Sequence, residues 1–233
     1  MSYSKSQGFP SPKVAFFSME FALAEALSIY SGGLGVLAGD FLRSARALSL
    51  PVVGVGILWG EGFSRQTIDA GGVPGDHPAP VDRTRLTRQD VTVQVSIEDK
   101  EVPLAVYRTE AYDNVPLYLL EPAREEDGWI TRRLYSSDGD DRIAQEIVLG
   151  VGGVRALEAL GIHVDFHHFN EGHAVFAGLE LLRRARTQIG HPSVEDERSI
   201  DCDPALFERA RHQIRKKVVF TTHTPIEAGN EKH

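Results

Sequence analysis

The sequence predicts an α/β fold in which helices flank a parallel sheet with an inserted β-hairpin region. Short apolar runs typical of buried strands alternate with longer segments of helical periodicity, and this order favours parallel pairing of the strands. The chain has 233 residues, of which 42% are hydrophobic and 25% charged, so it is long enough to bury a core of its own. Polar residues follow several predicted strands, where open parallel sheets bind their ligands.

The first predicted elements are a strand, a glycine-rich loop, a helix and a second strand. Residues 14–17 form a short apolar run, and residues 51–59 form another. Between them, apolar residues recur at helical spacing over 34–48. A strand, a helix and a strand in this order are typical of a parallel unit.

The middle of the chain predicts the antiparallel insertion. Residues 61–86 are rich in glycine, proline and aspartate and predict a long loop. Three β-like runs follow, at 91–97, 102–108 and 115–120. The first alternates apolar and polar residues, which predicts a hairpin strand with one side in solvent. Residues 121–141 predict a further polar loop.

A long helix is predicted to begin with Asp140 or Asp141 as its cap and to close at Gly161. Its buried side is predicted from apolar residues at helical spacing, which are Ile143, Ile147, Val151, Val154 and Leu157.

The last part of the chain predicts two strands and two helices. Residues 163–169 alternate as a strand, and residues 174–188 have a helical pattern. After an acidic loop at 195–203, residues 204–217 predict another helix. The apolar residues at 218–222 predict a final buried strand.

Charge and cysteine content narrow the class of protein. A net charge of −8 argues against a general binder of nucleic acids or anionic membranes, because such proteins need a basic surface. The single cysteine, Cys202, favours a reducing compartment. The sequence shows neither a secretory signal nor an apolar run of transmembrane length. We therefore expect a cytoplasmic protein without nucleic-acid or membrane partners.

The glycine loop at Gly32, Gly33 and Gly35 predicts an anion site. These glycines precede a helix, whose unpaired N–H groups and dipole attract phosphate, and glycine permits positive φ or close approach of a ligand. The residues from Gly33 fit a dinucleotide motif, but about a dozen residues separate them from the first strand, which the motif does not allow. The alternative is a tight turn that only lets the helix pack closely.

Polar side chains at three strand ends are candidate ligand contacts. Residues 167–173, H-H-F-N-E-G-H, lack metal-binding spacing, since a strand places His167 and His168 on opposite faces, and no metal site is expected. Asn170, Glu171 and His173 could contact a polyhydroxylated ligand, or form a turn network that caps the next helix.

The other two strand ends carry one candidate each. His223 lies between two threonines directly after a strand, a position that favours ligand contact. Glu20 follows the first strand, where it could contact a ligand or simply cap the loop.

Five blocks of the sequence resemble the α-glucan (glycogen, starch and maltodextrin) phosphorylases in order and spacing, and the similarity is greatest to the shorter bacterial and archaeal members. The resemblance extends over residues 13–230. The blocks are F-F-S-M-E-F, I-Y-S-G-G-L-G-V-L-A-G-D, L-P-V-V-G-V-G-I-L-W, H-F-N-E-G-H and V-V-F-T-T-H-T-P.

The resemblance implies the N-terminal, Rossmann-like lobe of a two-lobed, GT-B-type glycosyltransferase fold at residues 13–233, after a disordered N-terminus at 1–12. It implies phosphorolysis of terminal α-1,4-glucosyl units to glucose 1-phosphate, with an α-1,4-glucan and inorganic phosphate as substrates. The implied cofactor is pyridoxal 5′-phosphate, whose phosphate group exchanges protons with the substrate phosphate. A homodimer, or pairing with a separate C-terminal lobe, is also implied.

Site residues follow from the same resemblance. Gly32, Gly33 and Leu34, with Gly35 beside them, would form the loop at the cofactor and substrate phosphates. His223 would be the catalytic residue that hydrogen-bonds the glucosyl unit. The substrate-binding residues would be Glu20 on the acceptor side, Asn170, Glu171, His173, Thr222 and Thr224.

An important departure from the family concerns its C-terminal lobe. The family's cofactor lysine and its basic phosphate-binding groups belong to the C-terminal lobe, which this sequence does not contain, so we expect the fragment alone to be inactive. Two alternatives remain: a nucleotide-sugar glucosyltransferase of the glycogen- or starch-synthase type, and a non-catalytic glucan-binding module. Binding of maltooligosaccharides without turnover would favour the module.

Overall fold

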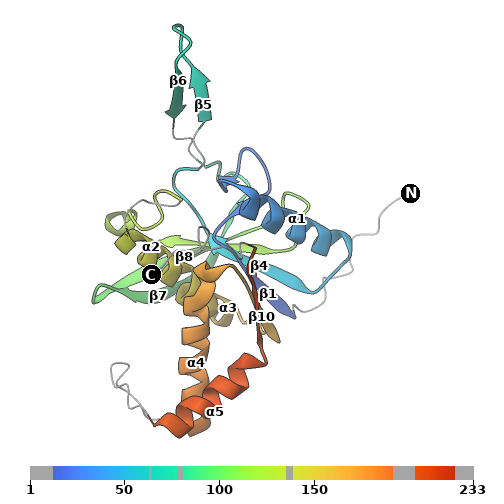
Figure 1. Cartoon of the computed structure of the whole chain (residues 1–233), viewed down its shortest axis with the longest axis vertical. Helices are drawn as coiled ribbons and strands as arrows, with labels where there is room; N and C mark the ends of the chain where they lie inside the picture. Colours follow the sequence, from blue (N-terminus) through green and yellow to red (C-terminus); the bar gives the residue numbers. More distant parts are fainter. Residues whose placement is uncertain (1–12, 63–64, 78–80, 135–138, 191–202, 224–233) are drawn as a thin grey trace.

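The protein has an α/β fold with a mostly parallel sheet flanked by helices, as predicted (Figure 1). The structure is a computed structural model that describes residues 13–62, 65–77, 81–134, 139–190 and 203–223. The expected disordered N-terminus at 1–12, Cys202, Thr224 and most of the acidic loop at 195–203 lie outside the described residues.

Seven strands form the main sheet, in the order β11-β10-β1-β4-β9-β8-β7. The first five in this order pair in parallel, and β8 and β7 add an antiparallel hairpin at the edge. The strands are β1 (Val14–Phe17), β4 (Val52–Ile57), β7 (Thr87–Ile97), β8 (Lys100–Thr109), β9 (Leu117–Pro122), β10 (Phe166–Asn170) and β11 (Val218–Thr221).

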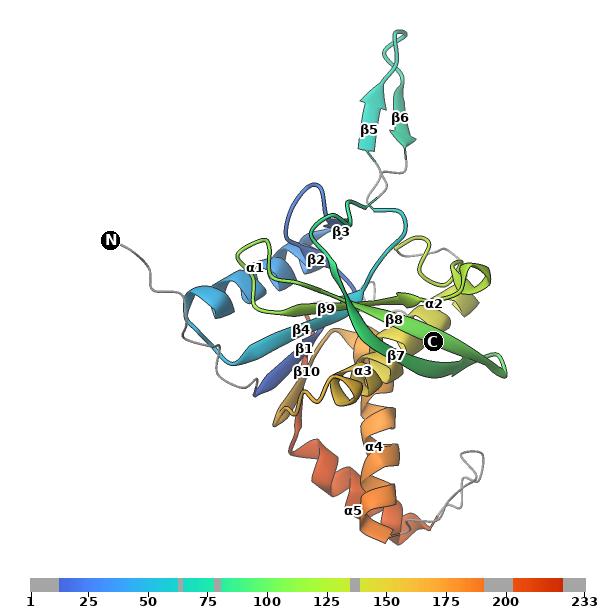
Figure 2. The ribbon, with the colours of Figure 1, turned by 180° about the vertical axis from the view of Figure 1, so that it is seen from behind.

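Helices cover both faces of this sheet. Figures 1 and 2 show α1 (Gly33–Ala47) on one face and α3 (Gly153–Ala159) with α4 (Val175–Gly190) on the other. Helix α5 (Pro204–Arg215) packs against α4 and leads into β11. It begins as predicted, because the Asp203 side chain accepts a hydrogen bond from the amide of Ala205 and Pro204 occupies the first turn. None of the helices in the described ranges is both long and apolar enough to cross a membrane.

The predicted loop at 61–86 contains a second hairpin. Strands β5 (Arg65–Ile68) and β6 (Pro74–His77) pair with each other and project away from the main sheet (Figure 2). Their sequences, R-Q-T-I and P-G-D-H, have no apolar alternation, so periodicity did not predict them. Further short elements are β2 (Phe21–Ala22), β3 (Ser28–Ile29), η1 (Glu125–Asp127) and η3 (Gly172–Ala174).

The long helix predicted before Gly161 is interrupted by a π turn. Helix α2 (Gly139–Ile147) continues through η2 (Val148–Gly152) into α3, and Gly161 then adopts a φ of +68° as a helix-closing glycine does. The predicted buried side is wrong for Ile143, which is 44% exposed. The wider turn changes which positions face the sheet, so one stripe cannot run through all three segments.

The final strand is not buried as the sequence predicts. Among the described residues β11 is an edge strand that pairs with β10 on one side. Val219 and Phe220 are therefore 46% and 55% exposed.

A candidate ligand-binding edge at the carboxyl ends of the strands

The polar residues predicted from three strand ends meet at one edge of the sheet. Because β1, β10 and β11 are parallel neighbours, Ser18, Glu171 and Thr222, which follow these strands, lie at the same edge. The chain leaves β1 for β4 on one side and later returns to β10 on the other. Such a reversal of strand order is where open α/β sheets bind ligands.

A chain of hydrogen bonds connects the three strand ends. The Ser18 hydroxyl donates to the Glu20 carbonyl oxygen at 3.0 Å and accepts from Asn170 Nδ2 at 3.1 Å. Asn170 Oδ1 lies 2.8 Å from His223 Nε2. Ser18 and Asn170 are almost completely buried, whereas His223 is exposed. Two buried groups thus hold one exposed imidazole.

The directions of these bonds assign the tautomer of His223. Since the Ser18 hydroxyl donates its only proton to a carbonyl, it must accept from the amide nitrogen of Asn170. The amide oxygen of Asn170 then faces His223, so Nε2 of the neutral ring carries the proton. Nδ1 is left as an acceptor that a hydroxyl group could use.

Glu171 has a backbone conformation that is rare for residues other than glycine. Its φ is +67° and its ψ is −179°, a combination that costs about 1–3 kcal/mol outside glycine. Its amide donates to the Thr221 carbonyl at 2.9 Å, and its carboxylate Oε1 accepts from the His223 amide. These bonds keep the end of β10 against the end of β11.

His168 of β10 contributes a further hydrogen bond between β10 and β11 near the same edge. Its Nε2 lies 2.7 Å from the Thr221 hydroxyl, and its ring packs edge-on against Phe16. Burial, and then the electrostatic effect of the nearby His223, lower the pKa of His168. His167 points to the opposite face, toward Phe17 and Lys217, so the predicted alternation is confirmed.

Glu20 binds the glycine loop. Its carboxylate Oε2 accepts hydrogen bonds from the amides of Ser31 at 2.7 Å and Gly32 at 3.2 Å, and the residue is only 2% exposed. Of the two sequence-based interpretations, loop capping describes this geometry. A carboxylate beside the start of α1 is also favoured by the helix dipole.

Of the two properties of glycine named for this loop, the structure shows close approach, at Gly35, and none of the three glycines has a positive φ. Gly32 is extended with a φ of −159°, and Gly33 and Gly35 lie within α1. A Cβ atom at Gly35 would lie 2.5 Å from Tyr30 Cβ and 2.8 Å from Glu20 Oε2. At Gly32 and Gly33 a Cβ would meet no atom of the described residues within 4 Å, so they leave this side of the loop open.

The amides at the start of α1 remain as donors. No described residue accepts a hydrogen bond from the amides of Gly33, Leu34 or Gly35, which are the unpaired positions of a helix start. Gly33 is exposed and Leu34 is half-buried. An anion at this loop could therefore use them.

Two further predicted site residues, Thr222 and His173, lie just after β11 and β10. Thr222 is exposed, and His173 is half-buried in η3. Within the described ranges, no group of three or more His, Cys, Asp or Glu residues is placed to hold a metal ion.

Sequence reasoning did not identify the bonding roles of Ser18, Ser31 and Thr221. Their only signal is that each lies at or just beyond a strand end or before the glycines.

The sequence matches glycogen and maltodextrin phosphorylases over almost its whole length. It is 39% identical over 236 residues to glycogen phosphorylase of Mycobacterium tuberculosis, a match that covers 94% of this chain and 26% of the relative. It is 34% identical to maltodextrin phosphorylase of Thermococcus litoralis, over 94% of this chain and 26% of that protein. The chain is homologous to part of the α-glucan phosphorylases.

The phosphorylase similarity extends to Aquifex aeolicus, whose glycogen phosphorylase is 32% identical over 96% of this chain and 32% of its own length. The chain thus spans about a quarter to a third of the length of these three relatives. No family model matches the chain.

Proposed function

We propose that this chain is the amino-terminal, Rossmann-like lobe of a GT-B-type α-glucan phosphorylase, and that the edge at β1, β10 and β11 forms one side of its active site. The hydrogen-bonded cluster that joins Ser18, Asn170 and His223 beside the glycine loop carries this proposal. The names of the relatives support it. The reaction would be phosphorolysis of an α-1,4-glucan to glucose 1-phosphate, in the cytoplasm, by a transferase of carbohydrate metabolism.

His223 would orient the terminal glucosyl unit. Its Nδ1 can accept a hydrogen bond from a sugar hydroxyl because Asn170 keeps the proton on Nε2. Glu171 would hold the His223 backbone in place through the bond to its amide. Asn170 is buried, so it would act through His223. The exposed Thr222 and the half-buried His173 would contact sugar directly, and so would Thr224, which lies outside the described residues.

The glycine loop would bind phosphate. Glu20 uses the amides of Ser31 and Gly32, so the amides of Gly33 and Leu34, with Gly35 behind them, would contact the phosphate oxygens. Here the open space beside Gly33 lets an anion approach the main chain. Glu20 would therefore position the loop and would not touch the glucan acceptor.

Pyridoxal 5′-phosphate fits this chain through its phosphate. The donors at the start of α1 suit a phosphate group, which when bound would exchange a proton with the substrate phosphate. The described lysines all lie elsewhere: Lys13 precedes β1, Lys100 begins β8, and Lys216 and Lys217 precede β11. The attachment lysine, and further groups for phosphate, would come from a second lobe in the same protein or in a partner. Activity would need that lobe.

A chimera tests the proposal. This chain would replace the matching region of the Mycobacterium tuberculosis relative, and glucose 1-phosphate formation would be measured from maltooligosaccharides and inorganic phosphate. We expect phosphorolysis, and a loss of kcat/KM of at least about tenfold in His223→Ala because a hydrogen bond to substrate is removed. The control is His212→Ala, on the exposed side of α5, which should leave activity unchanged.

Gly33→Val in the same chimera tests the phosphate role. The added side chain would fill the open side of the loop, so phosphorolysis should be lost while the fold is kept. Activity with an unchanged KM for phosphate would contradict this role. Turnover of ADP- or UDP-glucose without phosphorolysis would instead favour the synthase-type alternative, and maltooligosaccharide binding without either reaction would favour the glucan-binding module.

A further inference from the structure

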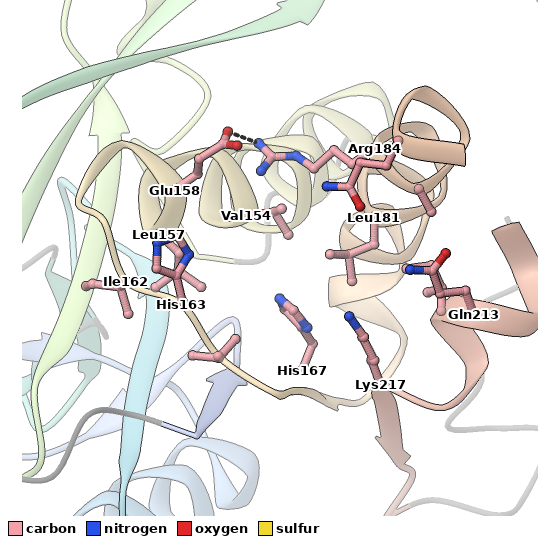
Figure 3. Close-up of a pocket in the computed structure, with 14 residues that line it drawn as sticks. Val154, Leu157, Glu158, Ile162, His163, His167, Leu181, Arg184, Gln213 and Lys217 are labelled. Carbon is pink, nitrogen blue, oxygen red and sulfur yellow. Dashed lines mark ion pairs between the residues drawn. The ribbon is translucent and has the colours of Figure 1, made fainter. Parts of the chain in front are cut away.

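A pocket of about 280 Å³ lies between α3, α4, α5 and the start of β10 (Figure 3). His167 near the start of β10 and Lys217 just before β11 extend into it. These are the amino ends of the two strands, opposite the ends that carry Asn170 and His223. A ligand here would not touch the glycine loop. The apolar side chains of the pocket are Val154, Leu157, Ile162, Val164, Leu181, Ala185 and Ile214.

Among the described residues, the pocket has one cation without a carboxylate partner, the exposed Lys217. Arg184 from α4 forms ion pairs with Glu158 of α3 at 2.8 Å and with Glu180 at 2.9 Å. Glu158 is the only carboxylate among the lining residues. No described carboxylate pairs with Lys217, which lies next to His167 across the strand pair. The other polar lining groups are His163 from the loop before β10, Gln188 and Gln213.

His167 lacks a partner at one ring nitrogen. The residue is 92% buried, since its exposed fraction is 8%, and Nδ1 has no hydrogen-bond partner in the described part of the chain. Burial, and then the charges of Lys217 and Arg184, lower the pKa of His167 to about 4. The imidazole is therefore neutral near pH 7 and lies in a positive electrostatic field. A negatively charged group between His167 and Lys217 would offset this positive field.

We propose that this pocket binds a small organic anion, with its carboxylate or phosphate between Lys217 and His167 and its apolar part on the side chains listed above. The apolar lining favours an organic anion over a simple inorganic ion, because burying the apolar part of the ligand away from water adds binding free energy. Binding at this site does not depend on the proposed phosphorylase reaction. It would be detected as a change in the pKa of His167.

Titration of the full chain, followed through the imidazole NMR signals, tests the site. Benzoate and phenyl phosphate are the probes, inorganic phosphate tests the need for an apolar part, and chloride at equal ionic strength is the control. The His167 signal is the one lost in His167→Gln. We expect both organic probes to raise the pKa of His167 by about one unit, because an anion within contact range favours the protonated ring. Binding of one probe alone would identify the carboxylate or the phosphate as the preferred head group.

Matched lysine variants locate the anion. Lys217→Gln should weaken binding about tenfold, as loss of a charged hydrogen-bond partner does, and Lys217→Arg should retain it. Lys216 is exposed, as Lys217 is, but it does not line the pocket, so Lys216→Gln should bind like the unmodified chain. The proposal is overturned if the probes act on His167 no more than chloride does, or if Lys217→Gln and Lys216→Gln bind alike. The titration of the unmodified chain decides the matter if Lys217→Gln does not fold.

Discussion

Replacing Gly35 by alanine separates two opposite expectations for the glycine loop. Helix propensity alone favours the change, since alanine within a helix is more stable than glycine by about 0.5–1 kcal/mol. The structure predicts the reverse. The new Cβ would lie 2.5 Å from Tyr30 Cβ and 2.8 Å from Glu20 Oε2, and carbon atoms normally stay about 3.5–4 Å apart.

The size of the effect follows from which atoms are crowded. Tyr30 Cβ is fixed to the main chain, so rotating a side chain cannot relieve that contact, and the backbone of the loop or of α1 has to move. Overpacking of this kind costs about 1–3 kcal/mol. After the gain in helix propensity, we expect Gly35→Ala to lower the free energy of unfolding by about 1–2 kcal/mol.

Urea unfolding of the full chain measures this change at constant m value. Gly33→Ala is the matched control, because it adds the same methyl group two residues earlier, where no atom of the described chain lies within 4 Å. It should change the free energy of unfolding by less than about 0.5 kcal/mol, as surface substitutions usually do. If Gly35→Ala is as stable as the unmodified chain, or if both variants are equally destabilised, the packing argument is wrong.

Two further predictions concern Glu171 and His167. Glu171→Gly and Glu171→Ala both remove the carboxylate that accepts from the His223 amide, but only alanine retains a side chain at a φ of +67°. The free energy of unfolding of Glu171→Gly should therefore exceed that of Glu171→Ala by about 1–2 kcal/mol, which raises its urea midpoint. Equal midpoints would contradict the strain. Burial and the neighbouring cations lower the pKa of His167 from 6.5 to about 4. Because the unfolded chain binds the proton first, stability should fall by roughly 3 kcal/mol as the pH decreases from 6.5 to 4. His167→Gln should remove this component from the pH dependence of unfolding, and an unchanged profile would show that His167 is not held neutral.

Local sequence patterns predicted most of the elements. The run at 14–17 became β1, the helical periodicity after Gly33 became α1, and the helix predicted from Pro204 became α5. These features depend on neighbours in the sequence, namely side-chain alternation, helical spacing and caps. The strand–helix–strand order also predicted a parallel sheet, and hence that the residues after β1, β10 and β11 meet at one edge.

Other features depend on contacts that no local pattern records. In the π turn at Val148–Gly152, Gly152 packs on the sheet, where an added Cβ would lie 2.6 Å from Leu104 Cδ1 of β8. The hairpin β5–β6 has no alternating apolar residues from which it could be predicted. Periodicity assigns a strand to Val219 and Phe220, but burial depends on whether another strand lies beside them.

The sequence by itself determined the fold class, the family resemblance and the set of polar groups at the strand ends. Only the tertiary structure decided what each group does, because a hydrogen bond between Asn170 and His223 joins residues 53 positions apart. The same holds for Glu20, whose carboxylate could face a ligand or the glycine loop until the amides of Ser31 and Gly32 were placed beside it. The side chain fixes which bonds a residue can form, but its role depends on the partners that folding brings within hydrogen-bond distance.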